Sequence, residues 1–258
     1  MAASLRIGCV KYLNARPLIH GWPGDVVFAD PTALCVKLAR GELDVALASS
    51  FEFLRNPIYR IVDGISISSA GPVYSVIVAH TRESSALNEI ELDPASQTSV
   101  AMLQYLIARR GGKFSPVEIA ADKLEPLPPN RARLLIGDQA ITFRQKFGDT
   151  CSYWDLGEEW QNVIGLPFVY ALWLVRPEVA RPREVGDQLR ALRDENLMKL
   201  NELITREKDF DPQFCARYYR EHIRFGFGEK EMEGLRTFGE LCASQGLLPK
   251  RLIEIEVV

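Results

Sequence analysis

Short apolar runs alternate with helical patterns over the first part of the chain. Leu34 and Leu38 stand at helical spacing within residues 31–40, and Gly41 ends this pattern. Pro17 suits the first turn of an earlier helix. Strands that alternate with helices at this spacing predict a parallel sheet with crossover helices. The expected strands of this first unit lie at residues 5–10, 26–30, 44–50, 61–69 and 73–80.

After these strands the pattern restarts and predicts a second, smaller α/β unit. A helix is expected over 96–110, where the segment SQTSV opens it, and short strands are expected over 117–119 and 133–136. A strand-like apolar return follows at 165–177. From residue 182 onward the spacing of leucines and charges is helical.

We therefore expect an α/β protein with two lobes. Residues 1–80 and 167–258 form a large discontinuous lobe, residues 81–166 form a small lobe, and the ligand cleft lies between them. Each lobe is an open sheet flanked by helices. The helical C-terminal region covers the large lobe or forms a dimer, and the sequence leaves the oligomeric state open.

Composition and charge favour a soluble protein with a small partner. Of the 258 residues 47% are hydrophobic and 25% are charged, the formal net charge is −3, and the scattered Lys and Arg residues leave no footprint for nucleic acid. No leader-like start and no run of about 18 uncharged apolar residues is present, so we expect a cytoplasmic protein without a membrane partner. The five widely spaced cysteines favour reduced, buried thiols.

The common cofactor and nucleophile motifs are missing from the sequence. It contains no phosphate-binding P-loop, no dinucleotide fingerprint, no H-E-x-x-H and no G-x-S-x-G. His20, His80 and His222 are isolated from one another. We therefore expect neither a metal site nor a cofactor.

Polar residues after the first expected strand are candidate ligand contacts. Lys11, Tyr12 and Asn14 stand there, and an open α/β sheet presents its ligand site at strand ends. Asn14 either contacts the ligand or caps the helix that contains Pro17. Lys11 either meets a carboxylate or is simply solvated.

Hydroxyl groups and a glycine follow two other expected strands. Ser49 and Ser50 end the third strand, where one of them caps the next helix while neighbouring N–H groups are placed to hold an anion. Ser69 and Gly71 stand in the turn after the fourth strand, where the glycine allows a ligand to approach the backbone closely.

The expected small-lobe helix start is a further candidate anion site. Ser96, Thr98 and Ser99 place three hydroxyls where a plain cap needs one. In the same lobe, Asp138 ends a strand and either caps the following helix or orients a ligand through its carboxylate.

Six motifs occur in a fixed order over roughly residues 5 to 175. They are GCVKYLNARPL, GELDVALASSFEF, ISSAGPVYSV, SQTSV, LLIGDQA and DLGEEWQNVIGLPFVYALW. Together they resemble the chorismate dehydratase family of the futalosine route to menaquinone. The resemblance implies a periplasmic-binding-protein type II-like fold and the removal of water from chorismate to give 3-[(1-carboxyvinyl)oxy]benzoate.

The resemblance also implies roles for the candidate residues. The substrate is a dicarboxylate whose two anionic groups are clamped by hydroxyl-rich helix starts from both lobes. Asn14 is expected to position the reacting groups while the enolpyruvyl carboxylate of the substrate takes the C3 proton, with Asp138 as the alternative base. Loss of the C4 hydroxyl then makes the ring aromatic, which drives the reaction.

Two other functions stay open from the sequence. One is a non-catalytic small-anion-binding or sensor protein of the same fold, since fold does not fix function. The other is the sibling dihydroxynaphthoate synthase of the same pathway, which carries a Ser-Pro-Cys-Pro-Asn-Asp type motif at its first strand. This chain has YLNARPL there, which favours the dehydratase.

Overall fold

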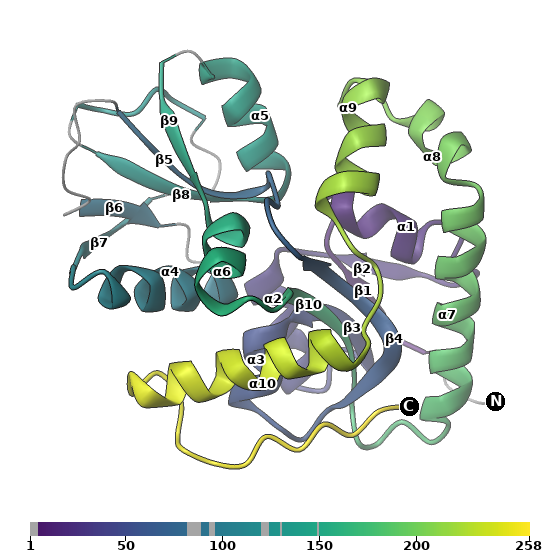
Figure 1. The fold of residues 1–258 in the computed structure, drawn as a ribbon. Coiled ribbons are helices and arrows are strands. Elements are labelled where there is room, and N and C mark those ends of the chain that lie inside the picture. The colour runs from purple at the N-terminus through teal and green to yellow at the C-terminus, as the bar shows by residue number, and fades with distance from the viewer. Residues whose placement is uncertain (1–4, 82–88, 93–95, 120–123, 130, 149) are drawn as a thin grey trace.

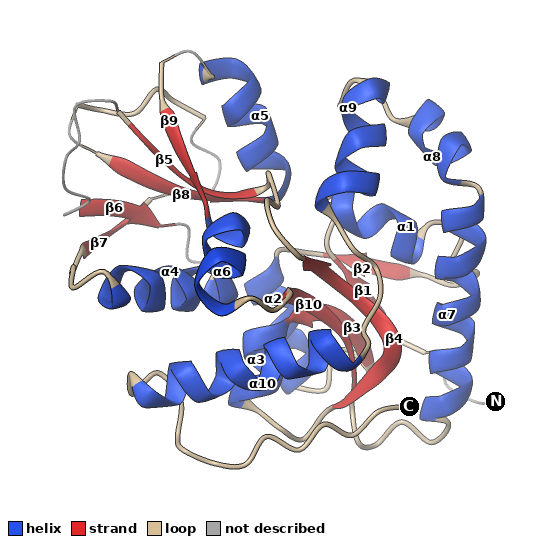
Figure 2. Cartoon of the chain, viewed as in Figure 1, coloured by secondary structure: helices blue, strands red, loops and turns tan. Residues whose placement is uncertain are grey.

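The computed structural model contains two five-stranded sheets, one in each lobe (Figures 1 and 2). It describes residues 5–81, 89–92, 96–119, 124–129, 131–148 and 150–258. In spatial order the first sheet consists of β2 (Val26–Phe28), β1 (Ile7–Cys9), β3 (Val45–Ser49), β10 (Phe168–Val175) and β4 (Arg60–Ser69). The second consists of β7 (Ser115–Glu118), β6 (Glu89–Leu92), β8 (Ala132–Ile136), β5 (Val76–His80) and β9 (Ser152–Asp155).

One strand in each sheet runs against its neighbours. β1 is parallel to β2 and β3, whereas β10 is antiparallel to β3 and β4, and β5 is antiparallel to β8 and β9. The parallel strands end at the cleft, so a chain that crosses from the other lobe enters at that edge and runs away from it. The first sheet is therefore mixed: the predicted parallel sheet is confirmed for β2, β1 and β3, and β10 is the antiparallel strand that the prediction did not include.

The strand β5 pairs within the second sheet, although the sequence assigned it to the first lobe. It forms ladders with β8 and β9 only after a bend at Tyr74, which has a φ of +66°. An apolar run announces a strand but does not say which strands will pair with it. The first crossing between the lobes is thus residues 70–75, and the second is residues 165–167.

Helices cover both sheets. The large lobe carries η1 (Leu13–Ala15), α1 (Arg16–Ile19), α2 (Pro31–Ala39) and α3 (Ser50–Arg55). The small lobe carries α4 (Gln97–Arg109), α5 (Gly137–Phe147) and α6 (Leu156–Ile164). The tail forms α7 (Pro182–Met198), α8 (Leu200–Arg206), α9 (Pro212–Arg217), η2 (Tyr218–His222) and α10 (Glu229–Ser244).

The tail helices pack on the large lobe. α7 lies against α1 and β4, while α10 contacts β10 and α3 and also reaches α4 of the small lobe (Figure 1). The tail therefore covers the large lobe, which is one of the two arrangements that the sequence left open. Within the described residues, no helix combines the length and apolarity that crossing a bilayer requires.

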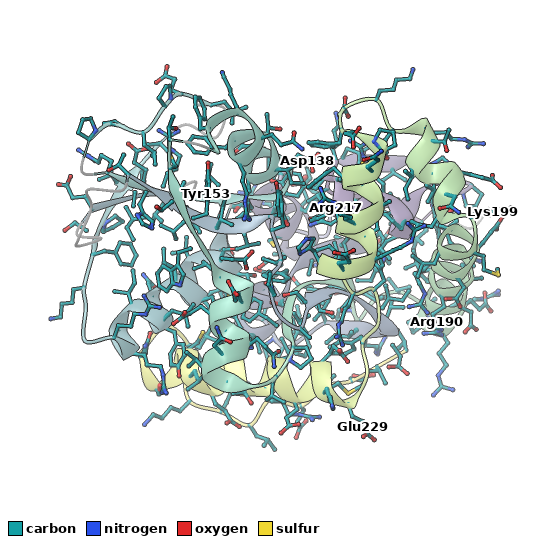
Figure 3. All side chains as sticks on the ribbon, turned by 45° about the horizontal axis from the view of Figure 1, so that its top comes forward. Asp138, Tyr153, Arg190, Lys199, Arg217 and Glu229 are labelled. Atoms are coloured by element: carbon teal, nitrogen blue, oxygen red, sulfur yellow. The ribbon has the colours of Figure 1, made fainter. Side chains whose placement is uncertain are left out.

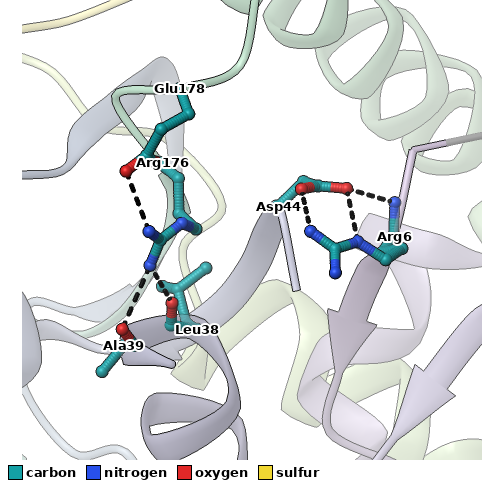
Figure 4. A network of polar contacts seen from close by, with 6 residues as sticks. All are labelled: Arg6, Leu38, Ala39, Asp44, Arg176 and Glu178. Carbon is teal, nitrogen blue, oxygen red and sulfur yellow. Dashed lines mark hydrogen bonds and ion pairs between the residues drawn. The ribbon is translucent and has the colours of Figure 1, made fainter. Parts of the chain in front are cut away.

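Two arginines fasten the end of the first sheet that lies away from the cleft (Figure 4). The guanidinium of Arg6 binds both oxygens of Asp44 at 3.0 and 2.6 Å, and these contacts lower the pKa of that carboxyl. Arg176 donates to the carbonyl oxygens of Leu38 and Ala39 at 2.5 and 3.2 Å, which ties β10 to the last turn of α2. Polar side chains thus brace this end of the sheet, opposite the edge where its parallel strands finish.

A buried carboxylate holds the first crossing. Asp155 caps α6 by accepting from the N–H groups of Gly157 and Glu158 at 3.0 and 3.1 Å. It also accepts from Val73 and Tyr74 in the crossing, at 3.1 and 2.7 Å. Four N–H donors on one carboxylate join the helix start to the bend at Tyr74.

The second crossing is held by aromatic packing. Ring centroids of Trp160, Phe168 and Phe238 lie 4.9, 4.8 and 5.8 Å apart in their three pairs. Gly234 on α10 sits against the backbone of Pro167, so closely that a methyl group on Gly234 would overlap the Pro167 carbonyl. The tail helix therefore approaches this crossing at backbone contact.

We expect Gly234→Ala to destabilise the fold by about 1–3 kcal/mol, because the added methyl must push α10 away from the crossing. Urea denaturation measures this. Gly226→Ala is the matched control, since no atom lies within 4 Å of its added carbon. Equal stabilities for the two variants would contradict the close contact.

Candidate active site

A cavity lies between the two lobes. It encloses about 620 Å³ that no protein atom fills, part of it open to solvent. The large lobe contributes Asn14, Ser49 and Tyr170 to its wall, and the small lobe contributes Ser96 and Gly137, among others. Both lobes must therefore be in place for the site to exist.

Four helices begin at the wall of this cavity. Pro31, Ser49, Gln97 and Gly137 mark the starts of α2, α3, α4 and α5, and all four line it. A helix start presents unpaired N–H groups and the positive end of the helix dipole. Among the described lining residues none is Lys, Arg, His, Asp or Glu, so the wall favours anions through backbone dipoles.

Several polar atoms in the wall are buried without a hydrogen-bond partner. They include Asn14 Oδ1, Ser96 Oγ and Gln97 Oε1. Ser96 stands at the cap position of α4, yet its side chain makes no capping bond. Because a buried polar group without a partner is costly, these atoms are suited to contact a bound ligand.

Direct hydrogen bonds join the lobes at two points. Ser49 Oγ bonds Thr98 Oγ1, which also accepts from the N–H of Phe51 at 3.3 Å. The N–H of Leu13 donates to Asp138 Oδ1 at 2.7 Å. The two lobes are thus in direct contact beside the cavity, in a closed arrangement.

Asp138 belongs to this interlobe contact. Its Oδ2 lies 3.9 Å from Arg16, which also binds Asp209 at 2.9 Å. Burial raises the pKa of Asp138 to about 6, although the Leu13 N–H and Arg16 oppose the rise. Figure 3 labels Asp138 on α5 of the small lobe and Arg217 on α9 of the tail.

Comparison with known proteins identifies the family. A family model described as menaquinone biosynthesis matches residues 5–244. The chain belongs to the menaquinone biosynthesis family. A chorismate dehydratase of Thermus thermophilus is 29% identical over 256 residues, covering 91% of this chain and 93% of that protein. The resemblance drawn from the six motifs is confirmed.

Solved structures confirm the fold expected for this member of the menaquinone biosynthesis family. An Archaeoglobus fulgidus protein matches with a TM-score of 0.72 and 20% identity, covering 95% of this chain and 98% of its own. The periplasmic aliphatic sulphonate-binding protein of Escherichia coli matches with a TM-score of 0.64 and 11% identity, covering 96% and 94%. The two sheets and their cleft are therefore those of a periplasmic-binding-protein fold.

Six of the eleven residues predicted for the site line the cavity of this family member. They are Tyr12, Asn14, Ser49, Ser96, Thr98 and Ser99. The capping alternative for Asn14 is wrong, because α1 is preceded by Ala15 and Asn14 lies inside η1. The capping alternative for Asp138 is also wrong, because Ile136 precedes α5.

Three predicted residues lie away from the cavity wall. Lys11 is exposed and faces a separate surface cavity beside Arg16. Ser50 is fully buried, and its hydroxyl donates to the carbonyl of Val169 at 2.6 Å. Asp138 bonds the backbone of the other lobe, as described above.

Ser69 and Gly71 lie behind the wall, against the start of α6. The Ser69 hydroxyl bonds the Tyr170 hydroxyl at 3.0 Å. A methyl group on Gly157 would come within 2.9 Å of Ser69 Oγ and 2.7 Å of the Gly71 carbonyl oxygen. These two residues therefore pack one lobe against the other.

Sequence reasoning missed three polar lining residues, Ser75, Gln97 and Tyr170. All three stand inside quoted motifs, and a polar residue at a helix start was a usable signal for Gln97. Tyr170 sits in an apolar strand and gives no local signal. Burial, and then the nearby Asp155, raise the pKa of Tyr170 well above its usual range, so its phenol is neutral.

Asp138 makes stability depend on pH in an unusual direction. Its folded pKa is about 6, above the ordinary value of 3.8, so the unfolded chain loses the proton first and stability falls as pH rises between these values. We expect Asp138→Asn to gain about 2–3 kcal/mol relative to the natural protein between pH 4 and pH 7. Urea denaturation across this range measures the difference, and a difference that does not change with pH would contradict it.

Proposed function

We propose that this protein is a chorismate dehydratase, a hydro-lyase that converts chorismate to 3-[(1-carboxyvinyl)oxy]benzoate in menaquinone biosynthesis by the futalosine route. Family membership and the relative named chorismate dehydratase support the pathway and the reaction. The observation that carries the proposal is the cavity wall, where four helix starts and unpartnered polar atoms meet without a charged side chain among the described lining residues.

The wall suits a dicarboxylate that also carries a hydroxyl group. Carboxylates bind well at helix starts, where N–H groups and hydroxyls donate to them. Ser96 and Ser99 at the start of α4 supply such donors, and Ser49 supplies one from the large lobe unless it keeps its bond to Thr98. The acceptor Asn14 Oδ1 suits the hydroxyl of the substrate.

The reaction removes a proton from C3 and hydroxide from C4, which together leave as water. The C3 proton is acidified through the conjugated ring carboxylate, and the product ring is aromatic. In this proposal the enolpyruvyl carboxylate of the substrate takes the proton while Asn14 holds the reacting groups in place. The lack of a carboxylate or imidazole among the described lining residues supports a base that comes with the substrate.

Asp138 is the weaker candidate for the base. Its side chain is not part of the cavity wall, and its carboxylate accepts from the N–H of Leu13 at 2.7 Å instead of facing the ligand space. The proposal also includes a cytoplasmic location. It is supported by the five cysteines, all of which are unpaired and buried, as expected in a reducing compartment.

The decisive test is turnover. Purified protein incubated with chorismate, without added metal or cofactor, is expected to yield a product that is lighter than chorismate by one water. Liquid chromatography with mass spectrometry measures this product. Asn14→Ala is expected to lower kcat about 100-fold, because the reacting groups lose their orientation. Asn201→Ala, on the exposed surface of α8, is the control and keeps full kcat.

Binding of chorismate without turnover by the natural protein would instead support the anion-binding alternative. Full turnover by Asn14→Ala would remove Asn14 from the mechanism and leave the reaction assigned.

Ser96 offers a test that separates ligand binding from helix capping. We expect Ser96→Ala to raise the KM for chorismate about 10-fold, since one hydrogen bond to a carboxylate is lost. It should leave the free energy of unfolding unchanged or slightly higher, because a buried hydroxyl without a partner is removed. The KM and urea denaturation are measured on the same preparation.

The control for this test is Ser50→Ala. Its hydroxyl donates to Val169, so its removal is expected to cost about 1 kcal/mol of stability. If Ser96→Ala lost that much stability and kept its KM, Ser96 would be a structural residue.

A further inference from the structure

Tyr218 reaches the cavity wall from the tail. It is fully buried, and its hydroxyl donates to Ser75 Oγ at 2.6 Å. The side chain of Asn14 lies beside the same hydroxyl, and its interaction with the phenol lowers the pKa of Tyr218. Asn14 and Ser75 both line the cavity, so one tyrosine outside the wall contacts two polar groups within it.

The directions of these contacts follow from the groups that take part. Oδ1 of Asn14 has no partner, so the side of Asn14 that faces Tyr218 is its amide NH₂, a donor group beside the phenol oxygen. The phenol proton goes to Ser75 Oγ. Ser75 then keeps its own proton to donate. The contacts of Tyr218 with Asn14 and Ser75 therefore leave Asn14 Oδ1 as an acceptor and the Ser75 hydroxyl as a donor for a ligand in the cavity.

The backbone beside Asn14 is held by the next residue of the tail. Tyr219 donates its hydroxyl to the carbonyl oxygen of Leu13 at 2.9 Å. The two tyrosines begin η2, a π-helical turn in which Ile223 N–H donates to the Tyr218 carbonyl at 3.1 Å. Such widened turns are frequent at functional sites. Here the turn directs Tyr219 to the backbone of Leu13 and Tyr218 to the side chain of the next residue, Asn14.

The Tyr218 ring is fixed by its own packing. It stacks on Phe214 with centroids 5.7 Å apart and planes 16° from parallel. Burial raises the pKa of Tyr218 far above its usual range, while the bond to Ser75 and the nearby Asn14 side chain oppose the rise. The hydroxyl therefore stays protonated at any working pH and keeps donating to Ser75.

We propose that Tyr218 is a positioning residue that fixes the Asn14 amide with its carbonyl oxygen toward the cavity and the Ser75 hydroxyl as a donor. The kinetic side of this proposal rests on the proposed dehydratase function, because Asn14 is assigned there to the reacting groups. Without the phenol hydroxyl the Asn14 amide is free to turn and to present a donor where the substrate hydroxyl needs an acceptor.

Tyr218→Phe tests the proposal while keeping the stacked ring. We expect kcat for chorismate to fall about 10- to 100-fold with KM changed less than about threefold, because orientation is lost and the carboxylate contacts remain. Tyr59→Phe is the matched control. Tyr59 is also buried in the large lobe, but its hydroxyl has no partner and does not line the cavity, so kcat stays at the natural value.

A double-mutant cycle shows whether Tyr218 acts through Asn14. In the Asn14→Ala background, Tyr218→Phe is expected to change kcat less than about twofold, because the group that it positions is gone. A further drop as large as the one in the natural background would overturn the proposal, and so would a Tyr218→Phe variant with full kcat.

A readout on the free protein separates this proposal from the proposed function. In the ¹⁵N–¹H spectrum, the side-chain amide signal that disappears in Asn14→Ala identifies the Asn14 NH₂. Tyr218→Phe should shift that signal upfield and speed its exchange with water, while Tyr59→Phe leaves it in place. If the natural protein did not turn over chorismate but this signal moved, the positioning would stand and the dehydratase would fall. An unmoved signal would refute the positioning whatever the activity.

Discussion

The direction of the strands is the constraint on which the site depends. In each sheet the strands that approach the cleft end there, and the chain can leave only by starting a helix or by crossing to the other lobe. β5 and β10 run away from the cleft because they follow the two crossings. Four other strands, β2, β3, β6 and β8, are each followed in sequence by a helix whose start lines the cavity, so four helix starts converge on it from both lobes.

This arrangement lets neutral groups hold an anion. Backbone dipoles are fixed by the fold and do not have to reorganise when the ligand binds. A lysine or arginine beside a carboxylate would favour its ionised form strongly and make it a weaker base. For a substrate whose own carboxylate takes the proton, a wall without cations among its described residues gives binding while it preserves basicity. The separate cavity that Lys11 and Arg16 line lies outside this wall.

The sequence predicted the parts of the site that depend on local position. Asn14, Ser49 and the SQTSV segment were found because strand ends and helix starts are visible in the order of residues. Ser69 and Gly71 satisfied the same rule, but α6 packs against them, and no local pattern reports that contact. The pairing of β5 was missed for the same reason, since a strand shows its apolarity and not its neighbours. Tyr218 is the extreme case, because the tail brings it to Ser75 across 143 positions of sequence.

The contact between Tyr218 and Ser75 also bears on why this fold would act as an enzyme. A protein that only binds and releases a ligand gains from lobes that part easily. Here Asp155 holds the first crossing with four N–H bonds, aromatic rings and α10 hold the second, and α10 touches both lobes. The tail then bonds Ser75 within the first crossing. The contacts that hold the two lobes together therefore also orient the polar groups of the cavity wall. Because holding the reacting groups in one orientation can lower a reaction barrier by several kcal/mol, crossings fixed by these contacts favour chemistry over simple capture.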